Sequence, residues 1–261
     1  MTTADAATAV DRVAAPAGHP EPTAAADSPM TGRQVPLGPT TGATPSSVQR
    51  PPLRLHARWH RAVKRSFDLL IGVPLLVLAL PLLVVLIALV RLSSPGPALF
   101  RQQRPGRDGR TFTIYKLRTM RVDAEQILAA DAALRQEFIA NGYKLPLDRD
   151  PRVTAVGRFL RRTSLDELPQ LFNVVLGTMS LVGPRPVLLE QAEELFGDDL
   201  DVYFAVKPGL TGLWQVSGRS SLTHEERARL DAAYVRCWSP MLDLKLLVRT
   251  VPAVLAARGA Y

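Results

Sequence analysis

One stretch of the chain, from Leu69 to Val90, contains 22 residues without a charged side chain. As a helix it would be long enough to cross a hydrocarbon core of about 30 Å. The simplest interpretation of this pattern is a single membrane-spanning anchor. It is the only membrane segment that the distribution of apolar residues predicts.

Two features of this apolar stretch favour a different path through the bilayer. Arginine and lysine residues flank its two ends in about equal numbers, whereas a spanning helix usually has more of them on its cytoplasmic side. Pro81 lies inside the stretch and predicts a sharp bend, and Pro74 could add a second kink. A bent helix that enters one leaflet and returns to the same side is therefore the alternative to a spanning anchor.

The polarity pattern divides the chain into three parts. Residues 1–52 are rich in Ala, Pro, Thr and Gly and have no apolar periodicity, which predicts a disordered tail. The tail has no apolar stretch that could serve as a secretory signal, so export is not indicated. We expect a basic flank and membrane helix in residues 53–92 and a cytosolic domain in residues 93–261.

The cytosolic part combines short strand patterns with helical ones. Ala98–Gln103 and Thr111–Arg118 are strand-like, and the glycines and proline between them predict a hairpin. Asp123–Asn141 has the spacing of an amphipathic helix, and a short basic helix is expected at Ala155–Arg162. Met241–Ala257 is typical of either an interfacial or a core helix, and we favour the interface. Its charged side carries Asp243, Lys245 and Arg249. These patterns predict an α+β fold that is mostly helical, with a β-hairpin and amphipathic interfacial helices.

Composition adds a strong positive charge to this picture. The formal net charge is +8 and the pI about 10.1, which favours anionic partners such as nucleic acid, acidic lipid headgroups or phosphorylated substrates. Only five of the 32 basic residues are lysines, and the arginines can bind a phosphate through two parallel hydrogen bonds. Cys237 is the only cysteine, which excludes an internal disulfide and a multi-cysteine zinc site.

Two adjacent carboxylates, Asp166 and Glu167, follow a pair of arginines at a predicted helix start. Ser164 to Glu167 matches a capping box, in which Ser caps the helix and Glu reaches back to it. With Ser164 as the cap, however, Pro169 would fall where a backbone N–H is already needed. With Asp166 as the cap, the proline lies in the first turn, where its missing N–H is harmless. The spacing leaves both registers open and by itself favours a capping role for the acids.

The same acids also suit chemistry on a phosphate. A carboxylate that attacks a phosphoryl group needs a divalent cation and arginines to neutralise the phosphate oxygens. Asp166 is a candidate nucleophile, because aspartate can form an acyl phosphate. Glu167 is a candidate Mg²⁺ ligand, because Mg²⁺ binds one or two carboxylates together with substrate phosphates. Arg161 supplies a nearby cation, and Arg185 lies between two prolines that restrict its backbone, which suits a phosphate ligand or an ordinary turn.

Several stretches, taken in order along the chain, resemble one family, the bacterial sugar transferases, also called small monotopic phosphoglycosyl transferases. The resemblance runs from about Lys64 to Arg249. It rests on six stretches: Lys64–Asp68, Arg104–Gly106, Tyr115–Met120, Thr163–Gln170, Gly183–Pro186 and Lys207–Gly212. A chance match in so many ordered stretches is not expected.

The resemblance implies an enzyme that transfers a sugar 1-phosphate from a UDP-sugar to polyprenyl (undecaprenyl) phosphate and releases UMP, through a covalent aspartyl-phosphosugar intermediate. This reaction would initiate the assembly of an exopolysaccharide, capsule or other glycan. It implies a catalytic dyad of Asp166 and Glu167, with Asp166 as the nucleophile and both acids available to bind Mg²⁺. By the same resemblance Arg161 and Arg185 would be phosphate ligands.

The resemblance also implies that the apolar stretch is a re-entrant helix-break-helix with both ends cytoplasmic. The catalytic domain, residues 93–261, would then face the cytoplasm at the inner (plasma) membrane and contact membrane lipid. The sequence departs from the family at the bend, where Leu80 stands in place of the serine that often precedes the hinge proline, here Pro81. A hydroxyl that could satisfy a freed backbone group is missing, which leaves the geometry of the break open.

A non-enzymatic, membrane-anchored scaffold that binds anionic lipid or nucleic acid is the alternative. It accounts for the charge and the anchor but not for the ordered Asp-Glu, Pro-Arg-Pro and Gly-Leu-Thr-Gly motifs. Nucleic acid is not expected as a partner, because aromatic residues are not interleaved with the basic stretches. The sequence leaves open which sugar is transferred, which polyprenol accepts it, which polysaccharide pathway is served and whether the chain forms a homodimer.

Overall fold

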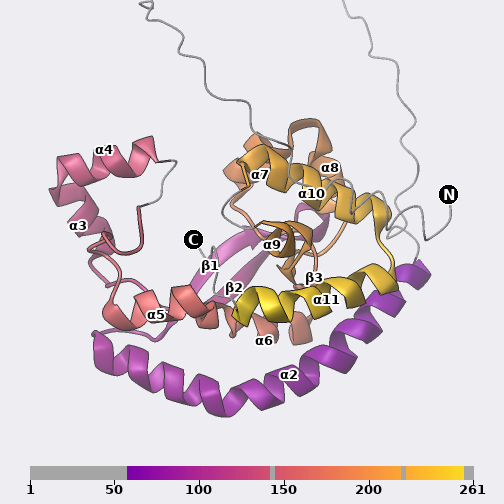
Figure 1. The fold of residues 1–261 in the computed structure, drawn as a ribbon, viewed down its shortest axis with the longest axis horizontal. Coiled ribbons are helices and arrows are strands. Elements are labelled where there is room, and N and C mark those ends of the chain that lie inside the picture. The colour runs from indigo at the N-terminus through magenta and orange to yellow at the C-terminus, as the bar shows by residue number, and fades with distance from the viewer. Residues whose placement is uncertain (1–57, 142–144, 219–221, 256–261) are drawn as a thin grey trace, which may run out of the picture.

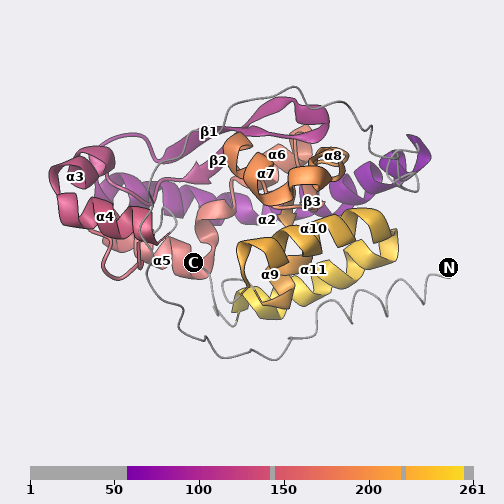
Figure 2. The ribbon, with the colours of Figure 1, turned by 90° about the horizontal axis from the view of Figure 1, so that it is seen from above.

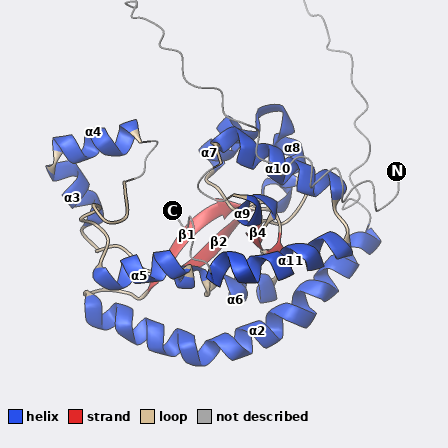
Figure 3. Cartoon of the chain, viewed as in Figure 1, coloured by secondary structure: helices blue, strands red, loops and turns tan. Residues whose placement is uncertain are grey.

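The computed structural model describes residues 58–141, 145–218 and 222–255 of the 261-residue chain. The predicted tail, residues 1–52, lies outside the described residues. The described part is mostly helical with small sheets and one long apolar helix, as Figure 3 shows. This composition is compatible with the expected α+β class.

The elements follow one another in a simple order. They are α2 (Arg58–Ser93), β1 (Leu99–Pro105), β2 (Thr111–Leu117), α3 (Ala124–Ala130), α4 (Ala132–Ala140), α5 (Ala155–Thr163), α6 (Gln170–Leu176), β3 (Ser180–Val182), α7 (Leu189–Phe196), α8 (Leu200–Phe204), β4 (Gly209–Thr211), α9 (Leu213–Ser217), α10 (His224–Cys237) and α11 (Pro240–Leu255). Strands β1 and β2 form an antiparallel hairpin, and β3 and β4 form a short parallel pair. In Figure 2 the hairpin lies along one side of the molecule and α10 and α11 along the other.

Helix α2 is continuous across both prolines, so the expected break at Leu80-Pro81 is not present in the described structure. The helix curves around the rest of the domain instead, as Figure 1 shows. Pro74 and Pro81 are seven residues apart and both exposed, so they lie on the side that faces away from the domain. A proline removes a hydrogen bond on its own side of the helix, so two prolines on the convex side favour a gradual curve.

The inner side of α2 packs against the domain along most of its length. Near its start the His60 ring lies 5.6 Å from the Trp238 ring, measured between centroids. In the middle, Gly72 allows close contact with α6, because a Cβ atom there would lie 3.2 Å from a methyl carbon of Val174. Near its end Leu86 and Val90 are buried in a cluster with residues of β2 and α5. The curve of α2 therefore follows the surface of one domain.

The outer side of α2 is apolar and exposed. Among the described helices, only α2 is long and apolar enough to cross a membrane, judged by length and composition. Few residues of its apolar stretch are buried. Its exposed residues include Leu70, Val73, Leu75, Val77, Leu78, Leu80, Leu82, Val84, Val85, Leu89 and Leu92. A surface of this kind needs an apolar environment.

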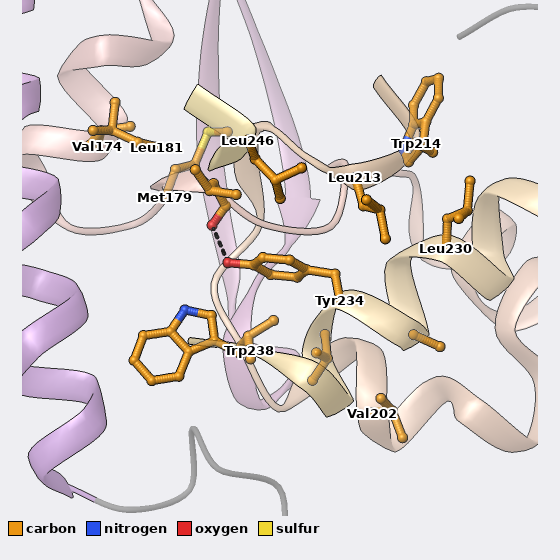
Figure 4. Close-up of a cluster of buried hydrophobic side chains, with 14 of the residues drawn as sticks. Val174, Met179, Leu181, Val202, Leu213, Trp214, Leu230, Tyr234, Trp238 and Leu246 are labelled. Atoms are coloured by element: carbon orange, nitrogen blue, oxygen red, sulfur yellow. Dashed lines mark hydrogen bonds between the residues drawn. The ribbon is translucent and has the colours of Figure 1, made fainter. Parts of the chain in front are cut away.

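The main core lies between α2 and α10, around β3 and β4. Figure 4 shows Tyr234 of α10, and Trp238 directly after that helix, among aliphatic side chains such as Leu213 and Leu246. The Tyr234 hydroxyl donates a hydrogen bond to the carbonyl oxygen of Val182 at 3.1 Å, which satisfies a polar atom inside the core. This core fixes the short parallel sheet from which the loop that carries Arg185 emerges.

The structure confirms the hairpin and the short basic helix but divides the expected helix at Asp123–Asn141 into α3 and α4. Asp131 has an extended backbone, with φ −116° and ψ 103°, and its side chain accepts a hydrogen bond from the backbone N–H of Leu134. Aspartate is a preferred N-cap residue. Because no residue of α3 or α4 is buried, packing does not oppose a new helix start at this position.

Helix α11 differs from the expected pattern at one residue of its charged side, Asp243, whereas Lys245 and Arg249 are exposed as expected. Asp243, expected on the charged outer side, is only 1% exposed and pairs with Lys64 of α2 at 2.7 Å. Four apolar residues of the helix are exposed instead: Met241, Leu244, Val248 and Val251. The buried acid is explained by a partner that lies 179 residues away in the sequence, which helical periodicity cannot reveal.

Candidate functional site

The two predicted catalytic acids lie on a single 3₁₀ turn, Leu165–Glu167, between α5 and α6. The predicted capping box is not formed, because the Ser164 side chain makes no capping hydrogen bond. Ser164 instead ends α5 with φ 58°, and its carbonyl accepts the backbone N–H of Glu167 at 3.3 Å. Asp166 is not the cap either, since α6 begins only after Pro169. The proline delays the helix, so the acids lie on a short turn of their own.

Glu167 is held by two cations from distant parts of the chain. Its Oε1 accepts hydrogen bonds from the Lys116 ammonium at 2.9 Å and from the Arg185 guanidinium at 3.0 Å. Lys116 comes from β2, and Arg185 from the loop after β3. Burial by itself would raise the pKa of Glu167, but Arg185 and Lys116 lower it to about 2. Glu167 is therefore the more acidic member of the pair.

Asp166 has the opposite electrostatic environment. Burial raises the pKa of its carboxyl group to about 6, and the negative charge of Glu167 contributes to the rise. The positive charges of Lys116, Arg161 and Arg185 oppose this shift. Two neighbouring carboxylates with different pKa values are common in active sites in which one acid reacts and the other stabilises charge.

The structure brings the four predicted site residues together. Arg185 contacts Glu167 directly, and the charge of Arg161 acts on Asp166. The Arg161 Nε donates a hydrogen bond to the Thr119 hydroxyl at 2.9 Å, which fixes the arginine against the segment that follows β2. Helix α5, the hairpin and the loop after β3 thus converge on one turn.

A glycine permits α5 to lie close to this segment. A Cβ atom on Gly157 would lie 2.0 Å from the carbonyl oxygen of Thr119, which is much closer than a van der Waals contact.

We expect Gly157→Ala to lower the free energy of unfolding by about 1–3 kcal/mol through overpacking, although alanine normally favours a helix. Thermal unfolding in a nonionic detergent measures the change. Arg162→Ala is the control on the same helix, because its ion pair with Asp148 lies at the surface and contributes little. Equal midpoints for the wild type and Gly157→Ala would contradict the prediction.

Arg185 is positioned through its backbone as well as its side chain. Its N–H donates to the Asp231 carboxylate at 3.3 Å, and its carbonyl accepts a hydrogen bond from the Tyr203 hydroxyl at 3.0 Å. Its guanidinium lies 5.7 Å from the centroid of the Trp214 ring, within the range of a cation–π contact. Burial raises the pKa of Asp231 well above its usual range. These contacts orient Arg185 toward Glu167.

Sequence reasoning assigned no role to Lys116 or Asp231. Lys116 lies within one of the six matched stretches, so its place in a motif was the available signal. Asp231 lies in α10 among other charged residues, and nothing in its spacing distinguishes it from a solvent-exposed acid. It is 3% exposed, which only the packing of α10 against the core could reveal.

The acid pair fits a metal ion that is shared with a substrate. In the described residues no group of three or more His, Cys, Asp or Glu side chains is arranged to hold a metal. Mg²⁺ does not require such a group, because it retains several waters and binds one or two carboxylates together with phosphate oxygens. Asp166 and Glu167 provide that number of carboxylates, and the adjacent cations suit phosphate. The residues present therefore fit Mg²⁺ together with a phosphate group.

Known proteins resemble this chain over most of its described length. A protein of Salmonella typhimurium, named undecaprenyl-phosphate galactose phosphotransferase, is 44% identical over 211 residues, which are 79% of this chain and 43% of that protein. The UDP-galactose-lipid carrier transferase of Erwinia amylovora is 46% identical over 205 residues, 77% of this chain and 42% of that protein. The chain therefore spans less than half the length of these two relatives.

A shorter relative matches almost from end to end. The exopolysaccharide production protein ExoY of Sinorhizobium fredii is 42% identical over 202 residues, which are 76% of this chain and 88% of that protein. The sequence model of the family described as bacterial sugar transferase matches residues 59–257, a range that contains the acid turn and both arginines. The chain belongs to the bacterial sugar transferase family.

Proposed function

We propose that the protein transfers a sugar 1-phosphate from a UDP-sugar to a polyprenyl phosphate and releases UMP, as an initiating step of exopolysaccharide or related glycan assembly. The observation that carries the proposal is the turn on which Asp166 and Glu167 are surrounded by Lys116, Arg161 and Arg185. The names of the relatives from Salmonella typhimurium and Komagataeibacter xylinus, both undecaprenyl-phosphate sugar phosphotransferases, support the same reaction class. A scaffold without catalysis would not require two half-buried acids among these cations.

In the first step, an oxygen of Asp166 attacks the β-phosphorus of the UDP-sugar. The bond from that phosphorus to the oxygen that bridges the two phosphates breaks, and UMP leaves with the electron pair. The sugar phosphate is then bound covalently to Asp166. Asp166 is better suited to attack than Glu167, because two cations withdraw charge from Glu167 while the raised pKa of Asp166 marks a more basic carboxylate.

In the second step, the phosphate of the polyprenyl acceptor attacks the same phosphorus. The Asp166 oxygen–phosphorus bond breaks, which restores the carboxylate and leaves the sugar on a polyprenyl diphosphate. Arg185, Arg161 and Lys116 neutralise the phosphate oxygens in both steps, since both nucleophiles and the phosphoryl group are anionic. One site can thus serve a soluble donor and a lipid acceptor in turn.

Mg²⁺, held by Asp166 and Glu167, would supply further neutralisation of the diphosphate. Its role is tested by removal. Without a divalent cation, the proposal predicts loss of UMP release and recovery when Mg²⁺ is added back.

The path of α2 supports a re-entrant membrane segment with the domain on one side of the membrane. If straight, a helix of 36 residues would be about 54 Å long. A spanning helix carries its ends to opposite faces of the bilayer, but both ends of α2 contact the same domain, through Trp238 at one end and Leu117 and Leu160 at the other. The exposed outer side would lie in one leaflet. Since nucleotide sugars are cytoplasmic substrates, we place the domain at the cytoplasmic face of the inner membrane.

Purified protein, a polyprenyl phosphate and a panel of UDP-sugars test the proposed function, with UMP release as the readout. UDP-galactose and UDP-glucose come first, because the relatives are named for galactose and glucose. Absence of UMP release with every donor, in the presence of Mg²⁺ and acceptor, would refute the proposal.

Arg185→Lys tests whether Arg185 binds the phosphate through two parallel hydrogen bonds. Lysine keeps the charge but cannot bind in the same bidentate manner, so we expect kcat/KM for the UDP-sugar to fall about 10- to 100-fold, the value of one charged hydrogen bond. Initial rates of UMP release measure the effect. Arg162→Lys makes the same exchange at an exposed residue and should leave the rate unchanged. Equal losses in the two variants would show that the position of Arg185 carries no special role.

A further inference from the structure

A second group of cations lines a pocket near the start of α2. The pocket encloses about 380 Å³, part of it open to solvent. Its charged lining consists of Arg61, Lys64, Arg65, Asp68, Arg107 and Lys207. Five of these six side chains are basic, so the pocket carries an excess of positive charge.

The acid and two of the bases of this pocket are already engaged by the fold. Asp68 is only 2% exposed and accepts hydrogen bonds from the Ser180 hydroxyl and the Leu181 N–H. Lys64 pairs with Asp243, and Arg65 donates to two carbonyl oxygens near the end of α6, at 2.6 Å each. These groups form the wall of the pocket.

Arg107 pairs with Asp108 at 3.2 Å, whereas Lys207 is a cation of the pocket that has no such ion pair among the described residues. In the part of the chain that the structure describes, no carboxylate forms an ion pair with it. Its ammonium and the Arg65 guanidinium meet beside Gly177, 3.4 Å and 3.2 Å from the place where a Cβ atom of that glycine would lie. Burial lowers the pKa of Lys207, and Arg65 and Arg107 lower it further. Like charges gathered in a half-buried site favour a bound anion.

This pocket is distinct from the acid turn. Leu165, next to Asp166, packs against the cluster that contains Leu86, whereas the pocket includes Asp68. The 18 residues that separate these two positions along α2 correspond to about 27 Å. The residues that line the pocket include neither the acid turn nor the cations around it, so the pocket is a separate site for an anion.

The surroundings of the pocket indicate the source of the anion. The apolar stretch of α2 begins at Leu69, directly after Asp68, and Leu70 is 75% exposed. Trp59, two residues before Arg61 of the pocket, is 71% exposed, and tryptophan is enriched at the headgroup level of membranes. A ligand in this place would have its phosphate among cations and its apolar part beside an apolar helix.

We propose that the basic pocket binds the phosphate of an anionic membrane phospholipid, and that this bound lipid holds the start of α2 at the headgroup layer. The inference rests on the proposed membrane location of the domain but not on its chemistry. Lys207 supplies the charge that the fold leaves available, and Arg61 and Arg107 complete the site.

The test uses the full chain in a nonionic detergent and follows thermal unfolding while phosphatidylglycerol or phosphatidylcholine is added. We expect phosphatidylglycerol to raise the midpoint by several degrees and phosphatidylcholine to leave it nearly unchanged. Lys207→Gln should weaken the apparent affinity for phosphatidylglycerol at least about fivefold, since one charged contact is lost. Lys245→Gln, which removes an exposed lysine of α11, is the matched control and should respond as the wild type does.

Further measurements distinguish a phospholipid from inorganic phosphate and from polyprenyl phosphate as the bound ligand. Stabilisation by inorganic phosphate as large as that by phosphatidylglycerol would overturn the lipid assignment, as would equal lipid responses of the wild type and Lys207→Gln. Loss of polyprenyl phosphate binding in Lys207→Gln, with phosphatidylglycerol binding intact, would also overturn it. UMP release is measured separately on each variant. Normal release without a lipid effect refutes the pocket alone, and a lipid effect without release refutes the proposed function alone.

Discussion

Asp166→Asn is expected to reduce UMP release at least about 1,000-fold while the protein still fractionates with membranes. Asparagine preserves the shape of the side chain but has no carboxylate to form the bond to phosphorus. Loss of a nucleophile removes an interaction made during the reaction, so kcat should fall rather than KM rise. A factor of this size corresponds to about 4 kcal/mol of activation free energy.

The fold should survive this substitution. Asp166 is a half-buried acid beside a second acid, and its raised pKa means that the folded protein disfavours its charged form. Replacing it by a neutral group removes the repulsion from Glu167, so the thermal midpoint should not decrease. A loss of activity with an unchanged midpoint would therefore be chemical in origin.

A second measurement separates the nucleophile from a residue that only binds the substrate. Incubation with a UDP-sugar labelled in the sugar, without an acceptor, should leave label on the wild-type chain and none on Asp166→Asn. Asp148→Asn is the control, because Asp148 is a largely exposed acid that precedes α5. Near-normal UMP release by Asp166→Asn, or label on both chains, would refute the covalent mechanism.

The sequence predicted the parts of the site that lie in local motifs. The hairpin follows from turn residues between two strand patterns, and the acids and Arg185 each lie in a short stretch that matched the family. The predicted capping box is not formed, because α6 begins only after Pro169. The position of this proline indicated a problem with the capping box but did not determine where the helix starts. The continuous curve of α2 depends on how the helix packs on the domain, which the positions of Pro74 and Pro81 alone do not determine.

Contacts between segments that are distant in the sequence could not be predicted from local sequence patterns. Lys116 reaches Glu167 across 51 residues, and Lys64 reaches Asp243 across 179. In both cases a charged residue that would ordinarily be assigned to the surface is placed by the tertiary fold against an opposite charge. Helical periodicity assigned Asp243 to the outer side of α11, because a lone acid on a helix is usually exposed.

Asp243→Ala is expected to be the most destabilising single change among those considered. The carboxylate is 1% exposed and accepts hydrogen bonds from Lys64 at 2.7 Å, from the Tyr234 hydroxyl at 2.7 Å and from the Trp238 indole at 3.1 Å. Alanine would leave a buried ammonium without its counter-charge and the Trp238 indole N–H without an acceptor, while the Tyr234 hydroxyl keeps the carbonyl oxygen of Val182 as an acceptor. Removing one partner of a buried pair costs about 3–5 kcal/mol, a large fraction of the 5–15 kcal/mol that stabilises a typical domain.

A double variant shows whether the loss comes from the unpaired charge or from the missing pair. Lys64→Met with Asp243→Leu replaces both charges by apolar groups of similar size, and such replacements are often nearly neutral. We therefore expect the double variant to be more stable than Asp243→Ala, as measured by denaturant unfolding in a nonionic detergent. Glu225→Ala is the control, because its pair with Arg229 is fully at the surface and should matter little.

This network also connects the stability of the domain to the position of α2. Lys64 belongs to α2, Asp243 to α11 and Tyr234 to α10, and Trp238 directly follows α10. One carboxylate therefore joins α2 to two helices of the core. If the ion pair anchors α2, Asp243→Ala should expose the first turns of α2 to proteolysis before the rest of the domain unfolds, and the double variant should restore their protection. Uniform cleavage of all elements in Asp243→Ala would instead mean that the network stabilises the core as a whole and does not anchor α2 in particular.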